Sequence, residues 1–333
     1  MNFPLYRRPG GIVFLDDDPA YLEMLAMVMP RHWRVELFVR PQDCINRLQQ
    51  EPPLWETDAW QQQQIVNRWR EGHALVPQIL SYWNENPSRF GLTHVCVVDY
   101  SMPGLNGLQV LAELVDWPGA RVLLTGRADE QIAVNAFNHG LIEQFIAKQT
   151  YDVTRRLAEV VQRLLDMPYA RHSNVWRSTL SPEQDTQLRN PSIARDLARL
   201  SEEHRWVEHV VIGNPFGVLA LDAAGTPSWL QLEKTARLGE LAELAESQGV
   251  PAGTVAQIRN GQQLINLELK LALKMAGAPD VSEAQALGAD RTLTCAYFSL
   301  AGHAEIKATH SYGAFLARYA DRTVHQYNPV DGA

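Results

Sequence analysis

The chain has 333 residues, a formal net charge of −8 at pH 7 and a hydrophobic content of 46%. This length suggests two domains, each able to bury a core of its own. The negative charge argues against broad nucleic-acid binding. No apolar run approaches membrane-spanning length, and the first eight residues lack the apolar core of a signal peptide. Three widely spaced cysteines favour a reducing compartment, so we expect a cytoplasmic protein that does not contact a membrane.

Four short apolar runs in the first half of the chain each end in a residue suited to chemistry. Such runs, closed by turn residues, predict buried parallel strands whose carboxyl ends meet at one edge of a sheet. Stretches of helix length separate the runs, so we expect a doubly wound sheet. The runs and the residues that follow them are 12–15 with Asp16 and Asp17, 95–98 with Asp99, 121–124 with Thr125, and 145–147 with Lys148. The helical stretches are 19–30, 42–50, 105–117, 129–140 and 152–167.

The residue types at these strand ends are those that phosphoryl transfer uses. Adjacent acids such as Asp16 and Asp17 are costly unless a cation lies among them, and Mg2+ prefers carboxylate and carbonyl oxygens. The hydroxyl of Thr125 can hydrogen-bond a phosphoryl oxygen, and the ammonium of Lys148 can neutralise phosphoryl charge. The carboxylate of Asp99 precedes a turn rich in Pro and Gly, at 100–107.

Residues 8–168 therefore resemble the receiver domain of two-component response regulators. The resemblance implies a flavodoxin-like fold with a five-stranded parallel sheet. It also implies that Asp99 accepts a phosphoryl group from a sensor histidine kinase or a phosphotransfer protein. The chain would catalyse only its own phosphorylation and would have no other enzymatic activity.

The same resemblance implies a role for each residue of the site. Mg2+ would be held by Asp16, Asp17 and Asp99, together with the backbone carbonyl of Ser101. Lys148 and Thr125 would take part in the transfer. The roles of the switch would fall to Thr125 and Phe145, which would move together once Asp99 is phosphorylated.

Two positions depart from the family pattern. Gln149 replaces the proline that usually follows the lysine, which weakens any argument for a cis peptide in this loop. Phe145 stands where tyrosine is frequent, so its ring can move inward but cannot donate a hydrogen bond.

Extra material, at about 51–91, lies just before the acceptor strand. It is rich in Trp and Gln, and its apolar spacing predicts two helices at 56–71 and 73–85. We expect this hairpin to pack over the sheet edge or against a partner. Two interpretations are about equal: an embellishment of internal packing, or a contact with a second copy or a kinase.

A helical linker at 169–190 and an α+β domain at 191–325, an output or sensor domain, complete the expected organisation. The domain would begin with a helix at 191–206 and contain antiparallel hairpins, and it leaves room for a small-molecule ligand. The remaining expected elements are strands 207–212, 216–221 and 228–232, helices 233–248 and 252–275, a hairpin of 293–300 with 304–310, and a helix at 311–320.

An alternative function is that of a transcription factor with a helix-turn-helix at about 240–260. The spacing of 245–255 fits that motif, with its second helix in the major groove. Against it, the first helix carries Glu240, Glu243 and Glu246, and Arg259 is the only nearby cation. We therefore favour a structural helix pair. The histidines of the expected domain 191–325 show no metal-ligand spacing. They are His204, His209, His303, His310 and His325.

The segment 137–142, the Trp-rich insertion and the C-terminal region together resemble the response regulators of small-molecule quorum-sensing systems in Legionella and related bacteria. In that group the output is not a known DNA-binding domain. We therefore expect a phosphorylation-controlled signalling protein that acts by homodimerisation or by contact with another protein.

Overall fold

A computed structural model describes residues 3–126, 130–167, 169–303 and 306–320 of the 333. The chain divides into two compact units, each built from segments that are far apart in the sequence. We call residues 9–58, 88–167 and 315–333 the parallel-sheet unit, and residues 1–8, 59–87 and 168–314 the antiparallel-sheet unit.

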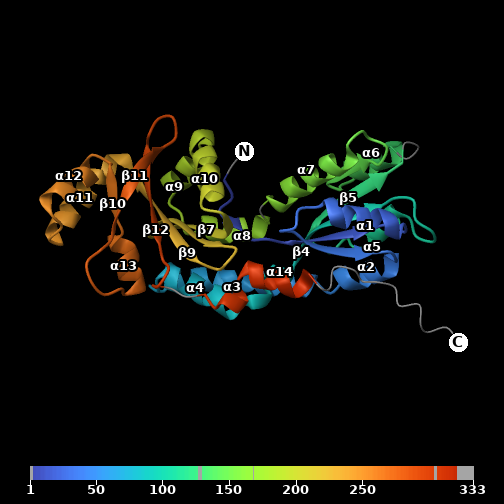
Figure 1. The fold of residues 1–333 in the computed structure, drawn as a ribbon, viewed down its shortest axis with the longest axis horizontal. Coiled ribbons are helices and arrows are strands. Elements are labelled where there is room, and N and C mark those ends of the chain that lie inside the picture. Colours follow the sequence, from blue (N-terminus) through green and yellow to red (C-terminus); the bar gives the residue numbers. More distant parts are fainter. Residues whose placement is uncertain (1–2, 127–129, 168, 304–305, 321–333) are drawn as a thin grey trace. The chain divides into compact units, whose positions relative to one another are not determined.

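The parallel-sheet unit contains a five-stranded sheet with the strand order β3-β2-β4-β5-β6 (Figure 1). All neighbouring strands run parallel, so the expected doubly wound, flavodoxin-like sheet is confirmed. The strands are β2 (Gly11–Leu15), β3 (Arg34–Phe38), β4 (Thr93–Asp99), β5 (Ala120–Thr125) and β6 (Gln144–Ala147).

Helices cover both faces of this sheet. Helices α1 (Pro19–Val28) and α7 (Val153–Leu165) pack on the face that includes Ile12 and Phe14. The opposite face includes Val13 and Leu15, and it is covered by α2 (Pro41–Leu48), α5 (Gly107–Glu113) and α6 (Glu130–Asn138). The central strands β2 and β4 are buried on both faces, which explains why their sequences are largely apolar runs.

Helix α5 is shorter than the predicted 105–117 at both ends, and Asn106 caps its start. The side chain of Asn106 accepts the N–H of Gln109, and the side chain of Gln109 accepts the N–H of Asn106. This capping box starts the helix at Gly107. The expected start of α6, residue 129, lies outside the described residues.

The antiparallel-sheet unit contains a seven-stranded sheet with the order β1-β7-β8-β9-β12-β11-β10 (Figure 1). Every neighbouring pair is antiparallel, which confirms the expected α+β character. The strands are β1 (Tyr6–Arg7), β7 (Trp206–Gly213), β8 (Phe216–Asp222), β9 (Pro227–Lys234), β10 (Gln263–Ile265), β11 (Val281–Leu287) and β12 (Leu293–Ser299).

The helices of the C-terminal part differ from the prediction in two places. The predicted helix 252–275 is wrong: α12 (Ala252–Arg259) ends before Gly261, whose φ of +71° favours glycine, and β10 follows. Helix α11 (Leu238–Ser247) begins later than 233, because β9 continues to Lys234. The remaining helical elements are α8 (Ala170–Arg177), α9 (Pro182–Leu188), α10 (Pro191–Glu203), α13 (Leu267–Leu273) and α14 (Tyr312–Ala320), with short 3-10 turns at Pro87–Gly91, Thr235–Arg237 and Ala308–His310.

The predicted hairpin of 293–300 with 304–310 is also wrong. Strand β12 pairs with β9 on one side and with β11 on the other. In the segment 304–310, the first two residues lie outside the described residues, and Ala308–His310 is a 3-10 turn.

The insertion forms the two predicted helices, α3 (Pro52–Arg70) and α4 (Leu75–Glu85). Residues 59–87 nevertheless group with the antiparallel-sheet unit rather than with the expected receiver range. Ile65, Ile79 and Trp83 are buried in one hydrophobic core with strands β7, β8, β9 and β12. The insertion therefore supplies part of the core of that unit.

Two further segments differ from the expected domain ranges in the same way. Strand β1 pairs with β7, so the first residues belong to the antiparallel-sheet unit. The expected linker 169–190 forms α8 and α9, and its Trp176 is buried in the same core. Its indole N–H donates to Gln62 Oε1 (2.7 Å), and Gln62 Nε2 donates to the Tyr6 hydroxyl (3.1 Å). A buried amide thus joins three distant segments of the sequence.

Within the described ranges, none of the helices combines the length and the apolar character that crossing a bilayer requires.

Candidate functional site

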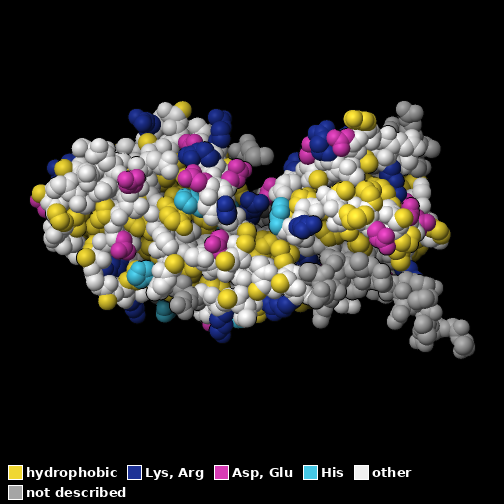
Figure 2. All heavy atoms as spheres, viewed as in Figure 1, with side chains coloured by type: hydrophobic (Ala, Val, Ile, Leu, Met, Phe, Trp, Pro, Cys, Tyr) yellow, Lys and Arg dark blue, Asp and Glu magenta, His cyan; other side chains and the backbone are white. Residues whose placement is uncertain are grey.

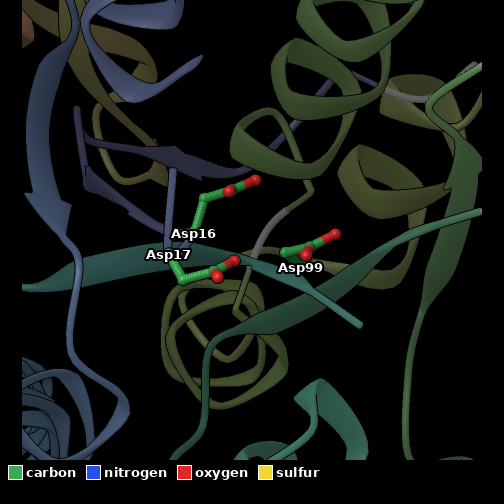
Figure 3. A group of neighbouring side chains, drawn as sticks. All are labelled: Asp16, Asp17 and Asp99. Atoms are coloured by element: carbon green, nitrogen blue, oxygen red, sulfur yellow. The ribbon is translucent and has the colours of Figure 1, made fainter. Parts of the chain in front are cut away.

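Three carboxylates meet at the carboxyl edge of the parallel sheet (Figure 3). Asp16 and Asp17 directly follow β2, and Asp99 is the last residue of the adjacent strand β4. One oxygen of each carboxylate lies within 4.8 Å of one oxygen of the others. Asp16 and Asp99 are buried, whereas Asp17 is exposed. The sequence-based expectation that the ends of β2 and β4 would bring these acids together agrees with this placement.

Lys148 joins this group from the end of β6. Its Nζ atom lies 2.7 Å from Asp16 Oδ2 and 2.8 Å from Asp99 Oδ1. Burial alone would lower the pKa of Lys148, but its hydrogen bonds and ion pairs with the two aspartates outweigh burial and raise the pKa above its usual value. The side chain therefore stays a cation at neutral pH.

Asp16 is a buried carboxylate whose negative charge is only partly compensated. Burial raises its pKa, and the hydrogen bonds from Lys148 and from the N–H of Asp18 (3.0 Å) only partly oppose that rise. The nearby charge of Asp99 acts in the same direction as burial. Three carboxylates thus face one ammonium, and a further cation would lower the free energy of the ionised group.

Thr125 ends β5, the strand next to β4. Its side chain is fully buried, and its Oγ1 atom has no hydrogen-bond partner among the described residues. A buried hydroxyl without a partner costs roughly 1–3 kcal/mol. This hydroxyl is therefore ready to donate to an oxygen that enters the site.

Ser101 and Phe145 occupy the edges of the site. The backbone N–H of Ser101 donates to Asp99 Oδ2 (3.2 Å), so the turn after β4 contacts the Asp99 carboxylate. Phe145 is half-buried and packs into the core shared by α2, α5 and α6. It lies in β6, three residues before Lys148.

The donor set fits a Mg2+ ion. The ligands that this ion prefers are oxygens, and one oxygen from each of three carboxylates lies within 4.8 Å of the others. The incompletely compensated charge at Asp16 adds a physical reason for a cation to bind there.

Sequence reasoning missed Tyr21, which also borders the site. The ring centroid of Tyr21 lies 4.7 Å from Lys148 Nζ. Burial raises the pKa of Tyr21, so its hydroxyl stays protonated at neutral pH. The sequence could have predicted this position, because the first turn of a helix that starts at Pro19 places residue 21 next to the end of β2.

Among known structures, a likeness extends over nearly the whole chain. No family model matches the chain, and no curated protein matches it. The chain is similar to the structure of the response regulator LqsR of Legionella pneumophila, with a TM-score of 0.75 and 23% identity. The likeness covers 98% of this chain and 100% of that one.

Shorter likenesses cover about half of the chain. One is to the receiver domain of an HD domain-containing protein from Pseudomonas fluorescens (17% identity, 50% of this chain, 92% of that chain, TM-score 0.32). Another is to a CheY-like receiver domain protein from Methanospirillum hungatei (16% identity, 48% of this chain, 94% of that chain, TM-score 0.30). These two scores are too low to support a conclusion. The full-length likeness shows that the chain shares its fold with that structure. In this chain the fold combines a five-stranded parallel sheet and a seven-stranded antiparallel sheet.

Proposed function

We propose that this protein is a response regulator of a phosphorelay and that Asp99 accepts the phosphoryl group. The observation that carries the proposal is the group of Asp16, Asp17, Asp99 and Lys148, drawn from the ends of three strands in a receiver fold. The donor would be a sensor histidine kinase or a phosphotransfer protein, and the chain would catalyse no other reaction.

The transfer uses the groups that surround Asp99. An oxygen of Asp99 forms a bond to phosphorus as the bond from phosphorus to the donor's imidazole breaks. The imidazole, protonated on its second nitrogen, leaves as a neutral ring with the electron pair. A Mg2+ ion held by Asp16, Asp17, Asp99 and the carbonyl of Ser101 would supply positive charge to the phosphoryl oxygens. Lys148 lies 2.8 Å from Asp99 and can contact the same oxygens.

Thr125 then supplies the switch. Its buried, unpartnered hydroxyl gains a hydrogen bond by turning toward a phosphoryl oxygen, which favours the phosphorylated arrangement. Phe145, on the neighbouring strand, can follow into the space that Thr125 leaves. The surface formed by α6, β6 and α7 would be remodelled as a result.

We propose that the antiparallel-sheet unit transmits the signal by homodimerisation or by contact with another protein, and not by reading DNA. Helices α11 and α12 pack on a small core that includes Ala242, Ala245, Val255 and Ile258. That arrangement is what a structural helix pair requires. On the face shown in Figure 2, acidic and basic side chains are interspersed, and no broad basic patch for phosphate contacts is visible.

Phosphoryl labelling of the full chain tests the proposal. Wild-type protein incubated with acetyl phosphate and Mg2+ should gain the mass of one phosphoryl group, and EDTA should abolish the gain. Asp99→Asn should not be labelled, whereas Asp116→Asn, an exposed aspartate of the same unit, should behave as wild type. Undiminished labelling of Asp99→Asn would show that the acceptor has been misassigned.

The mode of output has a separate test. Light scattering with and without a phosphodonor should show an increase in mass on phosphorylation if the output is a dimer switch. An unchanged mass would shift the proposal to contact with another protein. Retardation of DNA fragments at low salt by the phosphorylated protein would support the transcription-factor alternative.

A further inference from the structure

The ring of Tyr21 lies against the amino group of Lys148, at 4.7 Å, in addition to the two ion pairs of that lysine. An ammonium over an aromatic face is attracted by the negative charge of the ring face, and more strongly where water is excluded. The Tyr21 hydroxyl is buried and has no hydrogen-bond partner in the part of the chain that the structure describes. The position of the ring therefore does not depend on its hydroxyl.

The backbone holds Tyr21 directly beside the carboxylates. Asp18 caps helix α1, because its Oδ1 atom accepts the N–H groups of Ala20 (2.9 Å) and Tyr21 (3.3 Å). The N–H of Asp18 in turn donates to Asp16 Oδ1 (3.0 Å). The first turn of α1, which includes Tyr21, is thus linked by hydrogen bonds to Asp16.

The contacts of Lys148 change during the transfer. Asp99 loses its full negative charge when one of its oxygens becomes bonded to phosphorus, so its ion pair with Lys148 weakens. The contact with the Tyr21 ring does not depend on that charge. A flexible lysine side chain otherwise has many rotamers, and a constant third contact reduces the entropy it must lose.

We propose that Tyr21 is a positioning residue for phosphoryl transfer, whose ring holds the Lys148 ammonium over Asp99 while the acyl phosphate forms. The inference rests on the proposed function of Asp99 as acceptor. With acetyl phosphate as donor, the bond from Asp99 to phosphorus forms as the bond from phosphorus to the acetate oxygen breaks. Acetate leaves with the electron pair, and no proton is needed.

Kinetics of labelling in the full chain test the role of the ring. Intact mass measures the maximal rate and the half-saturating acetyl phosphate concentration in saturating Mg2+. Tyr21→Leu should lower the maximal rate about three- to tenfold, the range expected for one cation–π contact. Tyr21→Phe, which keeps the ring, should stay within about twofold of wild type. Equal losses in both variants, or no loss in Tyr21→Leu, would overturn the inference.

A second pair of measurements separates positioning from a general effect on folding. Replacement of Tyr21 by pentafluorophenylalanine keeps the shape of the ring and weakens its negative face, so it should slow labelling about threefold relative to Tyr21→Phe. In a Lys148→Met background, Tyr21→Leu should have no further effect on the rate. Additive losses in that background would mean that Tyr21 does not act through Lys148.

Labelling of the wild-type protein separates failure of the proposed function from failure of the Tyr21 inference. If wild-type protein is not labelled at Asp99, the proposed function fails and this inference fails with it. If wild-type protein is labelled and the Tyr21 variants match it, only the inference is overturned.

Discussion

At the scale of single residues, this site is marked by groups whose interactions are incomplete. Asp16 is buried with a raised pKa, because one lysine does not compensate for the burial of its carboxylate. Thr125 has a buried hydroxyl without a partner among the described residues. Such groups lower the stability of the resting protein, and both would gain partners when a cation and a phosphoryl group bind. Their cost is consistent with a function rather than with packing.

Replacement of Thr125 by valine tests this balance between stability and function. Thr125→Val removes the unpartnered hydroxyl and keeps the shape, so the free energy of unfolding should rise by about 1 kcal/mol. The increase in mass on phosphorylation should be lost, because valine cannot donate a hydrogen bond to the phosphoryl group. Chemical denaturation and light scattering measure the two effects, with Thr125→Ser as the control that restores a donor. A less stable Thr125→Val protein would show that the hydroxyl has a partner.

At the scale of elements, the turn between β4 and α5 packs closely against the backbone of Asp99. A Cβ atom on Gly107 would lie 2.4 Å from the carbonyl oxygen of Asp99, and the Gly107 N–H donates to the carbonyl of Tyr100 (3.0 Å). The helix can approach the strand end this closely only because residue 107 has no side chain. The close approach of α5 to Asp99 therefore requires glycine at position 107.

Gly107→Ala should lower the free energy of unfolding by roughly 1–3 kcal/mol, because the new methyl group displaces the backbone of Asp99. Labelling at Asp99 should slow as well. Gly239→Ala is the matched control: Gly239 lies in α11 with open space around it, so alanine should be neutral or stabilise the helix slightly. Unaltered stability of Gly107→Ala would mean that the turn can shift without cost.

The residues just before β1 contact the antiparallel sheet through a buried histidine. His209 of β7 donates from Nε2 to the carbonyl of Pro4 (2.9 Å), and its ring stacks on Phe3 with centroids 4.7 Å apart. Burial lowers the pKa of His209 to about 3, although the hydrogen bond to Pro4 opposes the change. The imidazole is therefore neutral in the folded protein at any physiological pH.

This lowered pKa predicts a loss of stability in acid. The unfolded chain takes up a proton on residue 209 near pH 6.5, whereas the folded chain does so only near pH 3. The stabilising contribution of neutral His209 is fully present above about pH 6.5. Below that pH, this histidine should lower the free energy of unfolding by up to about 1.4 kcal/mol per pH unit. Urea denaturation from about pH 7 to about pH 5 should show a shallower fall in His209→Gln than in wild type. His73→Gln, at an exposed position, should follow wild type; equal slopes in all three proteins would contradict the assignment.

At the scale of the whole molecule, the antiparallel-sheet unit is assembled from three separate segments. Residues 1–8 supply an edge strand, residues 59–87 supply core helices, and residues 168–314 supply the rest. The insertion lies between α2 and β4 of the parallel-sheet unit along the sequence. The chain thus passes repeatedly between the unit that carries Asp99 and the unit proposed as output.

Two tryptophans of the insertion test its place in the core. Trp83 is fully buried, so Trp83→Ala should destabilise the antiparallel-sheet unit by about 3–5 kcal/mol. Trp60 is 60% exposed, and Trp60→Ala should change stability by less than about 0.5 kcal/mol. Hydrogen exchange should show faster opening of β7, β8 and β9 in Trp83→Ala. Protection of these strands at the wild-type level would mean that the insertion packs on the surface and is not part of the core.

Sequence reasoning predicted four of the five strands of the parallel sheet, because each is an apolar run that ends in a polar residue. It did not place β3, whose sequence includes Arg34 and Glu36. Both charged side chains are buried and form an ion pair with each other, so the strand is not an apolar run even though it is buried. A pairing of that kind is not visible in composition or periodicity.

The sequence by itself determined the edge of the sheet at which Asp16, Asp17, Asp99, Thr125 and Lys148 meet, because parallel strands that end in polar residues place those residues at one edge. Only the tertiary structure decided that Tyr21 lies over Lys148, that residues 59–87 belong to the core of the other unit, and that β12 pairs with β9 and β11. The physical reason is the range of the interactions. Apolar runs, caps and turns act between near neighbours in the sequence, whereas strand pairing and core burial depend on the whole apolar surface that the folded chain must cover.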